Sequence, residues 1–178
     1  MKWQYLLVTV ILIAMVCAPA CTDEETSGPA PEARSPIQPG QVMVAVGDVT
    51  GNGTPRGTID TITFRVGLAS GGKSVKMENV SIVYADAVRM ETLRPVAGLR
   101  GYPPPGSWGI IEVKNEEGTP NNRLEYDEEF VIQINPKAPL VPRQFIMIVV
   151  EPPSGTSLTL RRVTPPAILG GKNILAAL

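Results

Sequence analysis

Apolar and polar side chains alternate along much of the chain after residue 40. Residues 62–68 place Ile, Phe, Val and Leu at every second position, and residues 130–134 repeat this period with Phe and two Ile. A period of two is typical of a strand with one buried face. We therefore predict strands over residues 41–47, 61–68, 80–85, 88–93, 110–113, 124–134, 144–150 and 157–163.

Segments rich in glycine and proline separate these strands. Residues 51–53, 70–72, 102–106 and 152–155 all have turn composition, because glycine allows positive φ and proline removes a ladder donor. Seven or eight short strands spaced in this way predict an all-β fold, an Ig-like antiparallel β-sandwich. Residues 146–150 are apolar at every position, which predicts a central strand covered on both faces. Residues 99–108 predict a surface excursion that Trp108 packs onto the sandwich.

The N-terminus has the pattern of an export signal. Lys2 precedes an apolar run over residues 5–17, which is shorter than the roughly 20 residues of a membrane span. Small residues at 18–20 then precede Cys21, so the chain has a signal-peptidase site after Ala20 and a lipobox-like setting for lipidation of Cys21. Plain cleavage after Ala20 and an uncleaved short anchor remain open.

Proline and acidic residues fill the next segment. Residues 22–40 contain four prolines and four acidic residues against a single arginine, a composition that predicts an extended tether. The chain thus divides into a signal peptide or short anchor (1–20), a tether (21–40) and a β-sandwich body (41–178).

Composition excludes several functional classes. The 178 residues contain no histidine and carry a net charge of −1, so histidine-based catalysis and a basic nucleic-acid surface are both missing. There is also no G-x-S-x-G motif and no glycine-rich phosphate loop before a helix. We expect neither an enzyme nor a cofactor.

A few residues remain as candidate sites. Asn52 and Asn79 begin N-glycosylation sequons. Asp48 and Asn52 match the start of a calcium loop, but two of its other positions fail, so we expect a plain turn there and no metal. The acidic run at 125–129 predicts a solvated face, and Arg161-Arg162 could pair with such acids on a neighbouring subunit.

Three segments taken in order resemble the archaellins, the archaeal flagellins. Residues 144–169 resemble the family's C-terminal strand pair, in which a Pro–Gly hairpin precedes an apolar strand and a basic residue. Residues 57–72 are similar to its first long strand and following turn, and residues 124–134 to its "Leu-Glu … Glu-x-Phe-x-Ile" strand. The resemblance implies the outer β-domain of an archaellum filament subunit.

The N-terminus differs from that family. Residues 1–20 lack the basic-Gly cleavage site, and the apolar run ends near residue 18, before Pro19 and the tether. Together with the export signal, the resemblance implies a non-catalytic structural protein at the archaeal surface, as a filament subunit or an archaellum-associated component in motility. Its partners would be other copies or archaellin-type subunits, with the membrane reached through the N-terminus. The alternative is a lipid-anchored surface lipoprotein for adhesion or attachment to the cell wall or S-layer.

Overall fold

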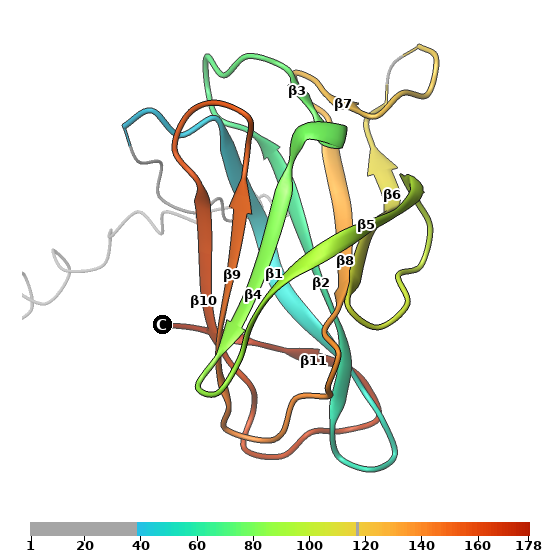
Figure 1. The fold of residues 1–178 in the computed structure, drawn as a ribbon, viewed down its shortest axis with the longest axis vertical. Helices are drawn as coiled ribbons and strands as arrows, with labels where there is room; N and C mark the ends of the chain where they lie inside the picture. Colours follow the sequence, from blue (N-terminus) through green and yellow to red (C-terminus); the bar gives the residue numbers. More distant parts are fainter. Residues whose placement is uncertain (1–38, 117) are drawn as a thin grey trace, which may run out of the picture. The chain divides into compact units, whose positions relative to one another are not determined.

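The computed structural model describes residues 39–116 and 118–178, and this part of the chain is built almost entirely of strands (Figure 1). The long strands are β1 (Met43–Gly53), β2 (Ile59–Leu68), β4 (Ser81–Asp86), β5 (Met90–Arg100), β6 (Ser107–Lys114), β8 (Glu129–Asn135), β9 (Phe145–Glu151) and β10 (Leu158–Val163). The short ones are β3 (Val75–Lys76), β7 (Arg123–Leu124), β11 (Gly171–Ile174) and β12 (Ala176–Ala177), and a 3-10 turn, η1, covers Met77–Asn79. The all-β prediction is confirmed.

The strands form two layers that are joined at both edges. The pairing order is β11-β1-β2-β8-β6-β5-β4-β9-β10-β12, so β1, β2, β8 and β6 form one layer and β5, β4, β9 and β10 the other. At the far edge, β11 pairs with β1 and β12 pairs with β10. The N–H of Leu175, which lies between these two short strands, donates to the carbonyl of Val49 over 2.9 Å. The C-terminal strands therefore close the sandwich into a barrel-like sheet.

The pair β5–β6 is parallel, whereas the sequence predicted antiparallel pairing throughout. After β5 the segment 101–106 doubles back, so Ser107 begins β6 beside Arg94. The prediction of a surface excursion over residues 99–108 is wrong at both of its ends, because Leu99 is a buried residue of β5 and residues 107–108 belong to β6. The prediction that Trp108 packs onto the sandwich is confirmed.

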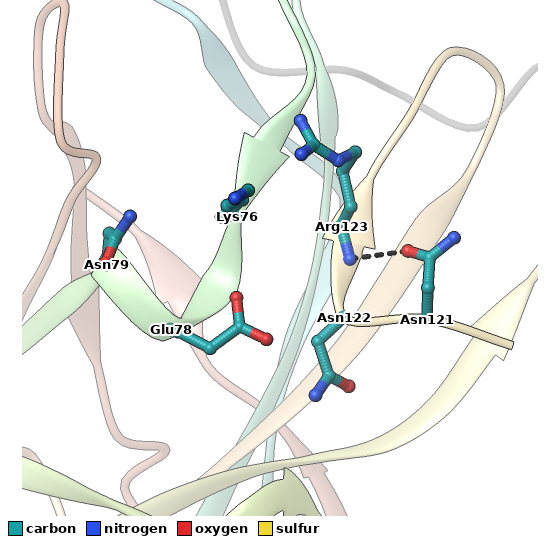
Figure 2. A pocket seen from close by; sticks show the side chains of 6 residues that line it. All are labelled: Lys76, Glu78, Asn79, Asn121, Asn122 and Arg123. Atoms are coloured by element: carbon teal, nitrogen blue, oxygen red, sulfur yellow. Dashed lines mark hydrogen bonds between the residues drawn. The ribbon is translucent and has the colours of Figure 1, made fainter.

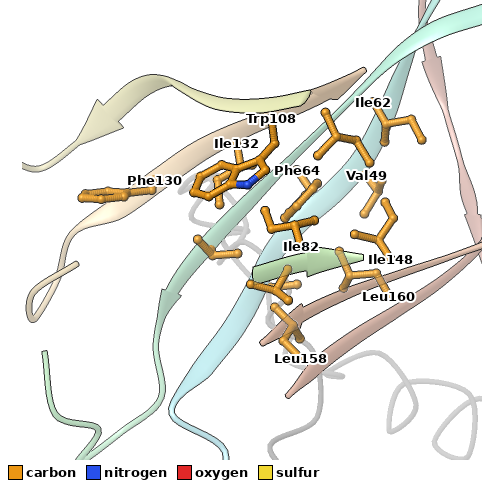
Figure 3. Close-up of a cluster of buried hydrophobic side chains, with 14 of the residues drawn as sticks. Val49, Ile62, Phe64, Ile82, Trp108, Phe130, Ile132, Ile148, Leu158 and Leu160 are labelled. Atoms are coloured by element: carbon orange, nitrogen blue, oxygen red, sulfur yellow. The ribbon is translucent and has the colours of Figure 1, made fainter. Parts of the chain in front are cut away.

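One core fills the space between the layers (Figure 3). The alternating residues of β2 and β8 point into it, and its largest aromatic side chains are Trp108, Tyr84, Phe64 and Phe130. Strand β9 lies between β4 and β10, but its side chains Met147 and Val149 are only half-buried. The prediction that this strand is covered on both faces is therefore wrong, and an apolar row is left on the outside of its layer.

Residues 48–53 form the second half of β1, not the turn that the sequence predicted. A Cβ on Gly51 would approach the side chain of Ile59 to 2.7 Å, and one on Gly53 would collide with the carbonyl oxygen of Leu169. These glycines allow close packing within the sheet and do not mark a chain reversal. The predicted strand at 124–134 is likewise interrupted by a turn, so it becomes β7 and β8.

Candidate interaction surfaces and modification sites

The outward faces of the two layers have different chemistry. On the β1–β2–β8 layer, the outward side chains include Thr61, Thr63, Arg65 and Gln133. On the β4–β9–β10 layer, two exposed polar side chains of β10, Thr159 and Arg161, accompany outward side chains that are mostly apolar: Val83, Ala85, Met147, Val149 and Val163. A contiguous apolar area on one face of a domain is typical of an interaction site.

This apolar row ends in a hollow near the β4–β5 hairpin. The hollow has a volume of about 280 Å³ and is lined by Ala85, Asp86, Ala87, Phe145, Ile146, Met147, Arg161 and Leu178. Phe145 is 62 % exposed. In the described part of the chain, the guanidinium of Arg161 has no hydrogen-bond or ion-pair partner. The site thus combines apolar walls with one uncompensated positive charge, and we call it the Phe145 hollow.

Asp86 holds the rim of the Phe145 hollow in place. Its buried carboxylate accepts hydrogen bonds from the Arg89 side chain (2.7 and 3.0 Å), the Tyr84 hydroxyl (3.1 Å) and the Gln144 amide (3.0 Å). It also accepts the backbone N–H groups of Val88 and Arg89, each at 2.9 Å. These bonds fasten the β4–β5 turn to the start of β9, so the rim is rigid.

The ionisation of this cluster follows from its contacts. Burial by itself opposes the charge on Asp86, but the hydrogen bonds from Arg89, Val88 and Tyr84 outweigh it and hold the pKa of Asp86 below its usual value. Burial, followed by the nearby Asp86 charge, raises the pKa of the Tyr84 phenol. Asp86 is therefore charged and Tyr84 neutral near pH 7.

A second exposed aromatic side chain lies at the opposite end of the sandwich. Tyr126 is 80 % exposed in the turn between β7 and β8, between Glu125 and Asp127. Glu128 is only 4 % exposed, and its carboxylate accepts the backbone N–H of Glu125 over 3.0 Å. The prediction of a solvated acidic face is therefore wrong for Glu128, which is a structural part of the turn. It is also wrong for Glu129, whose carboxylate lies 3.2 Å from Arg65 Nη1 and whose side chain is only 13 % exposed. We call residues 125–128 the Tyr126 turn.

A polar groove lies beside this turn (Figure 2). It has a volume of about 510 Å³ and is lined by Lys76, Glu78, Asn79, Asn121, Asn122 and Arg123. Several of its polar atoms are already engaged, since Asn121 Oδ1 accepts the Arg123 N–H (2.6 Å) and Asn122 Oδ1 accepts Arg100 Nε (3.2 Å). No nucleophile with an adjacent base lines this groove.

The two candidate glycosylation residues lie in different settings. Asn79 is exposed at the end of η1, whereas Asn52 is exposed within β1 and has paired strands on both sides. The sequence interpretation of Asn52 as a loop residue is wrong, because β2 and β11 flank it. Ala20 and Cys21, the candidate cleavage and lipidation residues, lie outside the described residues.

Asp48 and Asn52 do not form a loop around a common point. Both are exposed in β1, four residues apart, which is about 13 Å along an extended strand. Over residues 39–116 and 118–178 there is no cluster of three or more carboxylate or thiol side chains that could hold a metal ion. The same residues contain no helix of the length and apolarity that a bilayer crossing needs.

The sequence did not single out the aromatic and apolar residues of the Phe145 hollow and the Tyr126 turn. Phe145 and Met147 belong to a run that is apolar at every position, and such a run cannot be distinguished from a strand covered on both sides. Tyr126 lies within an acidic run that has the composition of an ordinary exposed turn. The one signal in the sequence was the hypothesis that Arg161-Arg162 pair with these acidic residues on a neighbouring subunit.

Comparisons with known proteins identify a matching family and similar solved structures. Residues 41–162 match the sequence model of the family described as archaeal-type flagellin. The fold is similar to that of flagellin FlaB1 from Methanocaldococcus jannaschii, with 16 % identity, a TM-score of 0.60, and coverage of 72 % of this chain and 93 % of the other. It is also similar to the archaeal flagellum subunit of Methanospirillum hungatei strain JF1, with 15 % identity, a TM-score of 0.54, and coverage of 77 % and 72 %. No curated protein sequence matches the chain.

Proposed function

Because the chain belongs to the archaeal-type flagellin family, a family of structural proteins of the archaellum, we propose that it is an exported, non-catalytic component of that machinery. The observation that carries this proposal is the family match over residues 41–162, which reaches from just before β1 to near the end of β10. The β-sandwich then has the role of an archaellin outer domain, displayed at the cell surface.

In this role the sandwich works by surface packing. The apolar outward face of the β4–β9–β10 layer and the Phe145 hollow supply contact area for neighbouring subunits, either other copies or archaellin-type proteins. Residues 1–20 serve as signal or anchor, and residues 21–40 hold the sandwich away from the membrane.

Glycans on Asn79 and Asn52 are a further part of the proposal. Both side chains are exposed, and an attached sugar at either position would point into solvent. Asn79 is the better acceptor, because η1 is a single turn at the end of the sandwich whereas Asn52 lies in a strand that is paired on both sides.

The second candidate function is a lipid-anchored surface lipoprotein used for adhesion or cell-wall attachment. The specific support is the sequence Ala18-Pro19-Ala20 before Cys21, which is a setting for lipidation after cleavage. An anchor with two lipid chains holds a protein firmly at a membrane, whereas a single chain binds reversibly. Such a protein would not enter a filament through an apolar N-terminal helix.

Two measurements on the native host test these functions. Mass spectrometry of isolated archaella should find this chain in a constant ratio to the filament subunits, and its absence there would contradict the proposal. Mass spectrometry of the mature N-terminus, with Cys21→Ala and the matched Cys17→Ala variant, tests the anchor. Lipidated Cys21, with membrane release in Cys21→Ala only, would favour the lipoprotein.

A further inference from the structure

We propose that two copies of this chain dock head to tail, with Tyr126 of one copy inserted into the Phe145 hollow of the next. The inference deepens the proposed structural role, because it names the two surfaces through which copies would meet. The contact itself is made by the sandwich, and its assay does not require assembly into archaella.

The two surfaces have complementary chemistry. The Phe145 hollow has apolar walls from Phe145 and Met147 and carries the Arg161 guanidinium, which has no partner among the described residues. The Tyr126 turn presents an aromatic ring next to two carboxylates: that of Glu125, which lies 4.0 Å from Arg123 Nε, and that of Asp127, which is exposed. The ring can fill the apolar space while the carboxylates approach the guanidinium, as in interfaces where an aromatic anchor is combined with charge pairing.

The size of the hollow allows a single aromatic side chain as its occupant. Its volume is about 280 Å³, and it is open to solvent on its outer side. Tyrosine is among the residues most often found as an anchor in such pockets. Tyr126, at 80 % exposure, loses much of its contact with water if it is inserted there.

Both surfaces are fixed before contact. In the Tyr126 turn, the Glu128 carboxylate accepts the Glu125 N–H over 3.0 Å, and the Asn115 amide donates to the Asp127 carbonyl over 3.1 Å. At the hollow, the Asp86 carboxylate accepts hydrogen bonds from the Arg89 N–H in the β4–β5 turn and from the Gln144 side-chain amide, so it links these two segments. Preorganised surfaces lose less conformational entropy on association, which favours binding.

The two surfaces cannot meet within one copy. The Tyr126 turn follows β7, which pairs with β3 at the end of the sandwich where β4 begins (Figure 1). The hollow is lined by Ala85 and Asp86 at the other end of β4. The six residues of β4 separate these ends by roughly 20 Å. A contact between two different surfaces of the same chain is heterologous, and repeating it generates an open row or a ring of copies.

The contact is small, so it is weak for free molecules. One turn in one hollow buries less than a standard interface of roughly 1,600 Å². Copies that are held on one membrane or filament have a high effective concentration, which raises the fraction of copies that form such a contact. The appropriate assay therefore traps the contact in the full chain within its membrane setting.

A photo-crosslinker at position 126 provides that assay. The full chain carrying Tyr126→benzoylphenylalanine, irradiated in host membranes, should form a dimer in which residue 126 is joined to a peptide containing residues 145–147. The control is Tyr102→benzoylphenylalanine, because Tyr102 is also 80 % exposed but lies in the 101–106 loop. It should give roughly tenfold less of this dimer.

Second substitutions identify the surfaces. Adding Arg161→Glu should lower the dimer yield by roughly fivefold or more, and adding Glu125→Arg and Asp127→Arg to it should restore much of the loss. When a crosslinker chain with Arg161→Glu is co-expressed with a heavier tagged chain whose hollow is intact, the linked product should contain both chains. A head-to-tail contact predicts this outcome, because the crosslinker chain contributes its residue 126 and needs an intact hollow only in its partner.

Three results would overturn the inference: no dimer at position 126, linkage to a peptide outside the hollow, or a yield insensitive to Arg161→Glu. The melting temperature of each variant shows whether it is folded, and Arg161 and Tyr126 are exposed. Loss of the crosslink with the chain still present in isolated archaella contradicts only this inference. A retained crosslink with the chain absent from archaella contradicts only the proposed function.

Discussion

Nη2 of Arg89 lies 2.7 Å from Oδ2 of the Asp86 carboxylate, three residues along the chain across the β4–β5 turn. The Asp86 side chain is fully buried, whereas that of Arg89 is 30 % exposed. The pair therefore closes a tight turn and at the same time fixes one wall of the Phe145 hollow. The contribution of Asp86 to the free energy of unfolding and its titration can both be measured directly.

Replacing Asp86 with asparagine should destabilise the sandwich by about 2–3 kcal/mol, because several charge-assisted hydrogen bonds to one buried carboxylate are lost. The free energy of unfolding in urea measures this loss. The matched control is Asp60→Asn at an exposed position near the start of β2, which should change stability by no more than about 0.5 kcal/mol. Equal effects of the two variants would contradict the role assigned to Asp86.

The same carboxylate predicts a loss of stability in acid. The pKa of Asp86 is lower in the folded chain than in the unfolded one, where it is about 3.9. Its contribution is therefore present above about pH 4 and is lost as the pH falls through the folded pKa. The hydrogen bond from Arg100 likewise lowers the pKa of Glu116. Melting temperatures between pH 5 and 2 should fall more steeply for the native chain than for Asp86→Asn.

Trp108 should tolerate phenylalanine far better than alanine. Its side chain is fully buried, but its Nε1 is the one buried side-chain polar atom without a hydrogen-bond partner in the described part of the chain. Trp108→Ala should cost about 3–5 kcal/mol from lost packing. In Trp108→Phe the removal of an unpaired donor offsets part of the packing loss. Chemical denaturation that gave equal costs would mean that the indole N–H does have a partner.

Asn173 should hold the C-terminal strands in place. Its side chain accepts the Leu169 N–H at 2.9 Å and donates to the carbonyls of Leu169 and Gly171, each at 2.8 Å. Asn173→Ala should lose about 1–3 kcal/mol and speed hydrogen exchange at the Leu175 N–H. Lys172→Ala, at the exposed neighbouring position, serves as control and should leave that exchange rate almost unchanged.

Glycan occupancy should be higher at Asn79 than at Asn52. Glycopeptide mass spectrometry of the chain from its native host measures both sites, and Asn79→Gln should remove most of the glycan mass. Asn121→Gln is the matched control, because Asn121 is exposed on the same groove but begins no sequon. Higher occupancy at Asn52 would contradict the view that strand pairing limits access.

Strand prediction succeeded where a single face of the strand is buried. In residues 62–68 and 130–134 the period of two directly reports which side chains reach the core. It failed at residues 48–53, because glycines that allow close contact with Ile59 and Leu169 have the same composition as a turn. It also missed β3, β11 and β12, which are too short to have a period.

The candidate surfaces also contain features that the sequence identified and features that it missed. The sequence identified Asn52 and Asn79 as sequons and Arg161-Arg162 as cations available to a neighbour, since these depend on residue identity alone. It assigned Glu128 to a solvated face, although the Tyr126 turn buries that carboxylate against the Glu125 N–H. Whether an acidic residue is exposed depends on a backbone donor that only the folded turn supplies.

By itself the sequence determined the all-β class, because alternation along a strand depends only on neighbouring residues. The pairing partners were decided by the tertiary structure: the parallel β5–β6 pair, the closure of the sheet by residues 171–177, and the outward apolar row that ends at Phe145. Partners far apart in the chain are selected by the packing of the whole core. The sequence of an apolar run such as residues 146–150 does not indicate which of its two faces that core will cover.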